Sequence, residues 1–96
     1  MITTKQRATL RGMANSIDTI LQVGKGGIGD ALRKQVDDAL TARELIKMRA
    51  LPTCELSARE VAHQLAGELS ADVVQVIGTR FVLYRNNPEK NLIKLS

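Results

Sequence analysis

Segments with helical and strand periodicity alternate along this chain of 96 residues, and their order restricts the folds open to it. Apolar residues recur at three- and four-residue spacing in three segments, which predicts helices capped by Thr3 or Thr4, by Asp30 and by Ser57. Ser57 is followed three residues later by Glu60, the pattern of a capping box. Apolar and alternating runs predict strands over residues 19–23, 44–51, 73–77 and 80–85.

The resulting order, αβαβαββ, predicts a fold of the α/β class. Two successive strand–helix–strand units imply parallel pairing with right-handed crossovers. A hairpin turning at Gly78-Thr79 then adds an antiparallel pair. We therefore expect a small mixed four-stranded sheet packed by three helices, a two-layer or three-layer sandwich with helices on both faces at least in part. The length predicts a single domain over residues 1–96, with residues 87–96 as a tail or a short edge strand.

The length and the residue types argue against several classes of function. The chain is too short for a complete two-half dinucleotide fold or a TIM barrel. It has no apolar leader and no apolar run near the roughly 20 residues of a membrane span, and the single Cys54 favours a reducing compartment, so we expect a cytoplasmic protein. His63 has no metal-ligand partner at a suitable spacing. We expect no enzymatic activity, no cofactor, no metal and no small-molecule substrate.

The positive charge is concentrated in one half of the chain. Residues 1–49 carry nine Lys or Arg and five Asp or Glu, whereas residues 50–96 carry five of each. The whole excess of +4 therefore lies in the first half. Such asymmetry favours a basic face and an anionic partner such as nucleic acid, although a charge of this size also serves solubility alone.

A glycine-rich segment, Gly24 to Gly29, follows a predicted strand and precedes a predicted helix. It matches the dinucleotide pattern G-x-G-x-x-G, but a helix precedes the strand, and the position about 20 residues on, where a ribose-binding acid belongs, lies near Arg49. A P-loop is excluded because no Lys-Ser or Lys-Thr follows the last glycine. The third interpretation is a G-x-x-G clamp over residues 24–27, whose main-chain N–H groups approach RNA phosphates closely.

Cations lie near this loop in the sequence. Arg33 and Lys34 fall in the first turns of the predicted helix, where they oppose its dipole unless an anion binds there. The alternative is that they form i,i+4 ion pairs with Asp37 and Asp38. Cations at 47 and 49 alternate outward from the strand over 44–51, either to contact phosphates or to protect a strand edge.

Only two side chains are aromatic, Phe81 and Tyr84, and they have opposite parity in their strand. We expect Phe81 in the core and Tyr84 at an interior edge with a hydrogen-bonded hydroxyl. So few rings argue against recognition of RNA by base stacking. Recognition of the backbone and of shape is the expected mode.

Several spaced motifs together resemble a known family. The chain contains Gly24-Lys-Gly-Gly after Leu21-Gln-Val, then Arg43-Glu-Leu-Ile-Lys-Met, Val74-Gln-Val-Ile-Gly and Val82-Leu-Tyr-Arg. In order and over nearly the whole chain, these resemble the CRM domain (chloroplast RNA splicing and ribosome maturation) in its stand-alone bacterial form, the YhbY type. The resemblance implies an RNA-binding αβαβαββ domain that uses the G-x-x-G loop and the neighbouring basic surface. Bacterial members are linked to maturation of the large ribosomal subunit.

Three positions depart from the family pattern. Arg43 stands where a His usually precedes Glu-Leu-Ile-Lys, and Asn15 stands where a His is common in the first helix. Gly29 replaces the Thr or Ser that would cap the second helix, so Asp30 is expected to take that role.

Together these observations predict a non-catalytic protein that binds structured, ribosomal RNA. Backbone contact is assigned to the loop and an electrostatic surround to nearby cations; the predicted RNA-binding residues are Gly24, Lys25, Gly26, Gly27, Arg7, Arg11, Arg33, Lys34, Lys47 and Arg49. The alternative is a protein-interaction module whose basic face docks an acidic partner, with RNA binding incidental. The sequence leaves the oligomeric state open.

Overall fold

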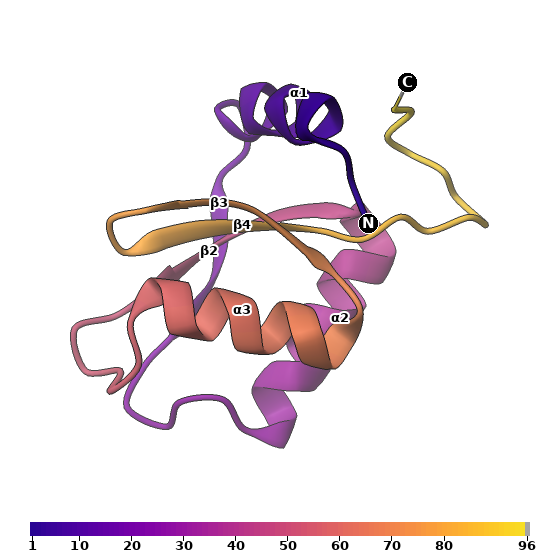
Figure 1. Cartoon of the computed structure of the whole chain (residues 1–96). Helices are drawn as coiled ribbons and strands as arrows, with labels where there is room; N and C mark the ends of the chain where they lie inside the picture. Colours follow the sequence, from indigo (N-terminus) through magenta and orange to yellow (C-terminus); the bar gives the residue numbers. More distant parts are fainter. Residues whose placement is uncertain (96) are drawn as a thin grey trace.

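The computed structural model describes residues 1–95 and contains the seven expected elements in the expected order (Figure 1). The helices and strands are α1 (Thr4–Ala14), β1 (Thr19–Val23), α2 (Asp30–Arg43), β2 (Leu45–Ala50), α3 (Ala58–Leu69), β3 (Asp72–Ile77) and β4 (Arg80–Tyr84). The predicted α/β class and the αβαβαββ order are confirmed.

The four strands form one mixed sheet with the order β1-β2-β4-β3. β1 and β2 pair in parallel, as the first strand–helix–strand unit predicts. The parallel pairing predicted for the second unit is wrong, because β4 lies between β2 and β3 and pairs antiparallel with both. The reason is that β4 is apolar on both faces: four of its five residues, all but Arg80, are buried. A strand of this composition belongs in the centre, whereas β3, which ends on the exposed Ile77, forms an edge.

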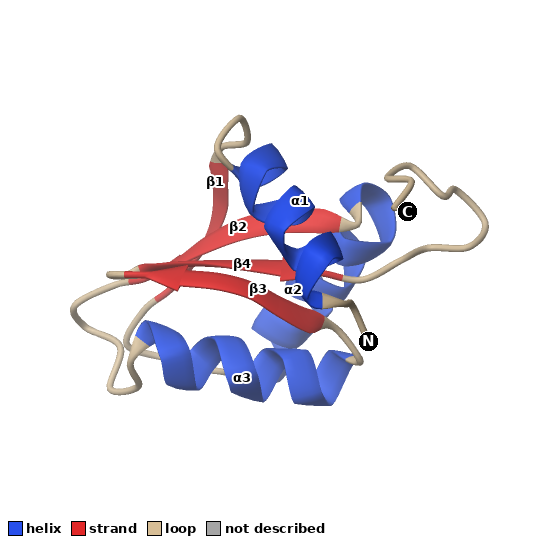
Figure 2. Ribbon diagram, turned by 45° about the horizontal axis from the view of Figure 1, so that its top comes forward, coloured by secondary structure: helices blue, strands red, loops and turns tan. Residues whose placement is uncertain are grey.

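Helices cover both faces of the sheet, so the fold has three layers (Figure 2). One face packs against α2 and α3 through a large cluster that includes Ile46, Met48 and Phe81. The other face packs against α1 through a smaller cluster that includes Leu10 and Tyr84. The two-residue period of β2 therefore points Ile46, Met48 and Ala50 toward α2 and α3, whereas Leu45 and the cations at 47 and 49 lie on the side of α1.

The helix starts follow the predicted caps in two of three cases. Thr3 and Ser57 both form complete capping boxes, the second with Glu60. The cap predicted at Asp30 is wrong: Gly29 is the N-cap of α2, with no side-chain hydrogen bond. Asp30 is instead the first helical residue, and its carboxylate pairs with the side chain of Arg33.

The segment after β4 is a tail and contains no strand over residues 86–95. Its apolar side chains Ile93 and Leu95 pack against the cluster beneath α1. The buried carboxylate of Glu44 accepts hydrogen bonds from the backbone N–H groups of Asn87 and Ile93. The tail is therefore held by apolar packing and by one acidic side chain from the α2–β2 junction.

Candidate nucleic-acid interface

The G-x-x-G segment forms a tight turn at the end of β1. The N–H of Gly27 donates to the carbonyl of Gly24 at 2.9 Å, and Gly27 itself has a left-handed φ of 63°. That conformation is strained for residues with a Cβ, which accounts for a glycine at position 27. A Cβ added at Gly26 would meet nothing within 4 Å, so its backbone is open to an approaching ligand. Lys25, at the tip, is exposed and forms no ion pair within residues 1–95.

The N-terminus of α2 follows this turn without a side-chain cap. Gly29 occupies the N-cap position in an extended conformation (φ −113°, ψ 179°). The first N–H groups of a helix have no intrahelical acceptor, and here no cap side chain accepts from them. Turn and helix end therefore present main-chain donors in succession, the arrangement that suits an anion.

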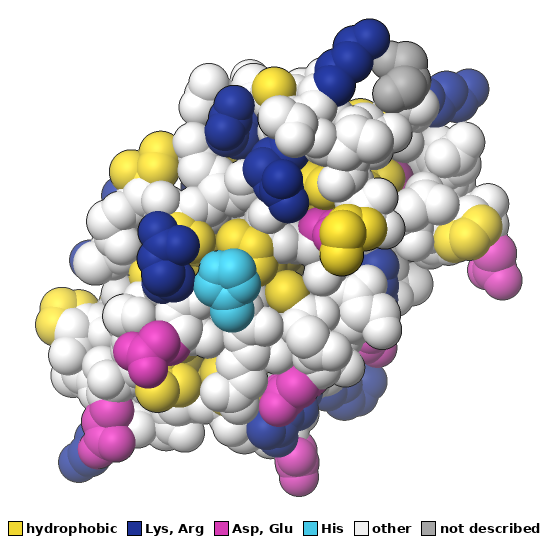
Figure 3. Space-filling model, in the orientation of Figure 1, with side chains coloured by type: hydrophobic (Ala, Val, Ile, Leu, Met, Phe, Trp, Pro, Cys, Tyr) yellow, Lys and Arg dark blue, Asp and Glu magenta, His cyan; other side chains and the backbone are white. Residues whose placement is uncertain are grey.

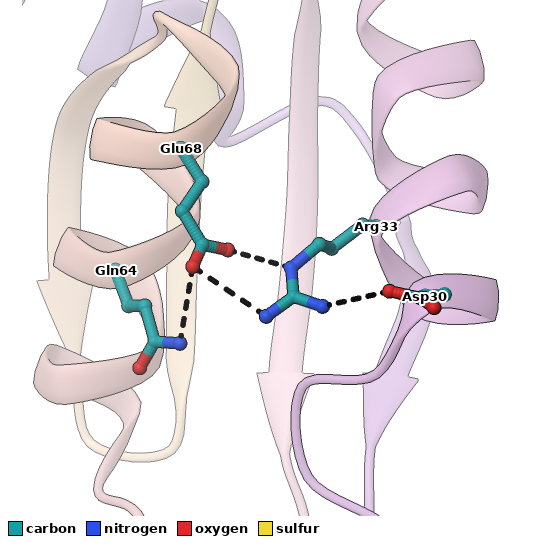
Figure 4. Close-up of polar contacts among 4 residues, drawn as sticks. All are labelled: Asp30, Arg33, Gln64 and Glu68. Carbon is teal, nitrogen blue, oxygen red and sulfur yellow. Dashed lines mark hydrogen bonds and ion pairs between the residues drawn. The ribbon is translucent and has the colours of Figure 1, made fainter.

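Two of the three cations of α2, Arg33 and Lys34, lie in ion pairs. Arg33 donates through Nε to Glu68 of α3 at 2.8 Å and through Nη1 to Asp30 at 3.1 Å (Figure 4). The hydrogen bond from Arg33 lowers the pKa of the Glu68 carboxyl, and Glu68 in turn raises the pKa of Arg33. Gln64 donates to the same carboxylate. Arg33 therefore links α2 to α3, and its charge is largely offset.

The two i,i+4 pairs considered for α2 have different outcomes. Lys34 pairs with Asp38 at 3.1 Å, as expected. The pair considered between Arg33 and Asp37 does not form, because Arg33 pairs with Glu68 of the neighbouring α3 instead. Asp37 instead accepts from Arg85 at 2.7 Å, a contact across 48 residues of sequence.

The cations on the opposite side of the sheet form no ion pair with an acidic residue of the described chain. α1 contains no acidic residue and carries Lys5, Arg7 and Arg11. Arg7 donates to the carbonyl of Val73 at 3.3 Å and so ties α1 to β3, whereas Arg11 is exposed. Lys47 lines two surface hollows on this side of the sheet, one of them with Asn15 of the α1 C-cap.

The structure thus separates the predicted RNA-binding residues into two groups. Among residues 1–95, every ion pair involves Arg33, Lys34 or Arg85, all on the side of α2 and α3. On the face shown in Figure 3, the upper part, toward α1 and the C-terminal end of the chain, carries mostly Lys and Arg, whereas the lower part, toward α2 and α3, carries Asp and Glu together with Lys and Arg. The loop lies at the end of β1, and of the predicted cations outside it, those without an ion pair among residues 1–95 lie on α1 and β2.

Both aromatic rings are buried, on opposite faces of β4. Phe81 packs with α2 and α3, and Tyr84 packs with the α1 cluster, so Phe81 lies in the core as predicted. No hydrogen bond to the Tyr84 hydroxyl is formed within residues 1–95, contrary to expectation. Burial raises the pKa of Tyr84, and the charges of Glu44 and Asp72 add to the shift. Within the described chain, no exposed ring offers a stacking platform.

Sequence reasoning missed three residues that the structure makes prominent. Arg80 lies directly opposite Arg49 in the β2–β4 pair, which cannot be anticipated without knowing that β4 is central. Glu44 anchors the tail through the N–H groups of Asn87 and Ile93, each more than 40 residues away in the sequence. Arg85 anchors the start of the tail through Asp37. His63 is exposed and Cys54 is half-buried. In the described part of the chain no three His, Cys, Asp or Glu side chains gather as metal ligands.

No helix formed by residues 1–95 is long and apolar enough to cross a lipid bilayer.

Comparison with known proteins gives consistent matches over most or all of the chain. A family model described as the CRS1 / YhbY (CRM) domain matches residues 2–85. A Bacillus subtilis protein named "Probable RNA-binding protein YqeI" is 43% identical over 95 residues, covering 99% of both chains. A Haemophilus influenzae protein named "RNA-binding protein" is 28% identical over 91 residues, covering 95% of this chain and 92% of its own. The solution structure of SAV1595 from Staphylococcus aureus is 43% identical, with a TM-score of 0.83 and full coverage of both chains.

Proposed function

This chain belongs to the CRS1 / YhbY (CRM) domain family, and we propose on that basis that it is a non-catalytic RNA-binding protein. Two relatives that match this chain over 92% or more of their own length are named "Probable RNA-binding protein YqeI" and "RNA-binding protein". The further step, to structured ribosomal RNA during assembly of the large subunit, rests on the link between bacterial family members and that process.

The observation that carries the proposal is the exposed turn of Gly24 to Gly27 at the uncapped start of α2. Gly26 has free space around its backbone, and Lys25 has no internal ionic partner among the described residues. Main-chain N–H groups, a helix N-terminus and an unpaired lysine together favour a phosphate group. The loop supplies close contact with the RNA backbone in this proposal.

The basic side of α1 supplies the electrostatic part. No ion pair within residues 1–95 involves Arg7, Arg11 or Lys47, so their charge is available to an RNA backbone. Arg33 and Lys34 would contribute less than the sequence suggested, because each already has a carboxylate partner. Contacts of this kind position the RNA without reading its bases.

The loop is tested by placing a negative charge within it. In Gly26→Asp the fold is retained, because the φ of Gly26 is outside the left-handed region and a Cβ there meets no neighbour. The carboxylate repels phosphate, so the affinity for a large-subunit ribosomal RNA transcript falls by about tenfold or more, equivalent to about 1.4 kcal/mol. Filter binding or fluorescence anisotropy measures the change.

Gly67→Asp is the matched control. It makes the same substitution in α3, where a Cβ also has open space. We expect this variant to bind the transcript nearly as the natural protein does. Equal affinity of a folded Gly26→Asp protein and its control would exclude the loop as the clamp. Crosslinking followed by sequencing of the bound RNA then tests whether the target is ribosomal.

A further inference from the structure

One row of side chains crosses the whole sheet on the side of α1. The row consists of Gln22 of β1, Arg49 of β2, Arg80 of β4 and Ile77 of β3, each paired in register with the next. We refer to these four residues as the open row. Neighbouring strands lie about 4.8 Å apart, so the row extends roughly 14 Å from edge to edge.

Helix α1 does not cover the open row. The sheet residues that pack in the α1 cluster are Leu45, Val74, Val82 and Tyr84, which lie farther along the strands. None of the four residues of the open row belongs to either hydrophobic cluster. Gln22 and Arg80 are exposed, and the side chain of Ile77 is 63% exposed. This half of the sheet therefore presents a polar, basic surface.

The centre of the open row is electrostatically unfavourable by itself. Arg49 and Arg80 are direct cross-strand partners, and like charges in such positions repel. Neither forms an ion pair within residues 1–95. The Nε atom of Arg49 is buried and has no hydrogen-bond partner. Two arginines at paired positions of neighbouring strands, one of them with an unused buried donor, are chemically complementary to a phosphate, which binds arginine through paired hydrogen bonds.

The open row lies next to the glycine loop. The N–H of Leu51 donates to Val23 at 2.8 Å, and the N–H of Ala50 donates to Thr79 at 2.7 Å. These bonds align the ends of β1 and β2 with the β3–β4 turn at one margin of the sheet. Gly24 follows Val23 directly, Arg49 precedes Ala50, and Arg80 follows Thr79. An RNA strand held at the loop can therefore continue onto the open row.

We infer that Arg49 and Arg80 form a second phosphate-binding site, which takes a backbone phosphate of the RNA strand held by the glycine loop. This inference rests on the proposed function, and it adds Arg80 to the predicted contacts. Lys47 lies two residues before Arg49, on the same face of β2, and contributes further positive charge. With no aromatic ring in the row, the site binds the backbone and leaves the bases unread.

RNA binding provides the first test. Arg49→Gln and Arg80→Gln each remove one phosphate contact, so each lowers affinity for the ribosomal RNA transcript several-fold and reduces the slope of log K against log salt by roughly 0.7 to 0.9. Arg59→Gln is the control, since Arg59 is exposed on α3 and unpaired among the described residues. If both variants bind as the Arg59→Gln protein does, the second site is excluded while binding at the loop stands.

Inorganic phosphate provides a test that does not depend on RNA. In NMR titrations of the full chain, we expect phosphate to shift the side-chain Nε–H signals of Arg49 and Arg80, and not that of Arg59. Such shifts in a protein that failed to bind RNA would support the anion site and refute the proposed function. Phosphate titration that leaves the Arg49 and Arg80 signals unmoved would overturn the inference.

Discussion

Glu44 illustrates how one side chain can order a segment that has no regular secondary structure. Its fully buried carboxylate accepts from the N–H groups of Asn87 and Ile93 at 2.9 and 2.8 Å, and its carbonyl accepts from Arg85 at 2.9 Å. Its backbone has a positive φ of 67°, a conformation that costs about 1–3 kcal/mol in a residue other than glycine. The hydrogen bonds to the tail offset this cost.

Replacing that carboxylate should destabilise the protein. Glu44→Gln keeps the shape but turns one acceptor oxygen into an N–H₂ donor that faces a backbone N–H. We expect the free energy of unfolding to fall by about 1–3 kcal/mol, the cost of leaving a buried polar group unsatisfied. Urea denaturation measures the loss, and Glu55→Gln, at an exposed position, serves as the control. Equal stability of the two variants would show that the Glu44 carboxylate does not hold the tail.

At the scale of residues, the sequence predicts which side chains are buried or exposed better than it predicts which side chains contact one another. Phe81 as a core residue and the outward cations at 47 and 49 follow from strand periodicity. The contacts of Glu44 with the tail do not, because an acidic residue at a helix–strand junction is ordinarily solvated. Nor does the pairing of Arg33 with Glu68, which requires α2 and α3 to lie side by side.

At the scale of elements, α2 differs from the other two helices in how it begins. α1 and α3 start with complete capping boxes, whereas α2 starts at Gly29 with no side-chain cap. The first turn of α2 is therefore the least stabilised of the three helix starts. In the proposed function, the N–H groups left free there are the ones that face phosphate.

Adding a cap should stabilise α2. Gly29 has an extended backbone, and a Cβ there meets nothing within 4 Å, so any residue fits. We expect Gly29→Ser to raise the free energy of unfolding by a few tenths of a kcal/mol and Gly29→Ala to lower it, a difference of about 1 kcal/mol between the two. Thermal or urea denaturation measures both variants. Indistinguishable stabilities would mean that this helix end frays and contributes little to folding.

The elements themselves could be predicted from the sequence, but their order in the sheet could not. Periodicity, turn residues and capping patterns are local, and they locate all seven helices and strands over the described chain. Strand order depends on which strand is buried on both faces. The apolar residues of β4 indicate such a strand. Two successive strand–helix–strand units, however, usually place their parallel strands side by side, and they therefore predict a different order.

At the scale of the whole molecule, charge is divided between the two sides of the sheet. Acidic partners neutralise Arg33, Lys34 and Arg85 beside α2 and α3. No such partners accompany the cations of α1 and of the open row within residues 1–95. The sequence locates the excess charge in residues 1–49, but only the fold shows that this half of the chain contributes to both sides. In the proposed function, the cations of α1 and of the open row are the ones that contact RNA.

The salt dependence of RNA binding tests the proposed function most directly. Each phosphate neutralised by the protein releases condensed counterions, so log K falls with log salt by roughly 0.7 to 0.9 per contact. The loop, the open row and the basic side of α1 together offer at least three contacts, which predicts a slope of about −2 or steeper for a large-subunit ribosomal RNA transcript. An affinity that stays constant as salt rises would contradict binding to the RNA backbone.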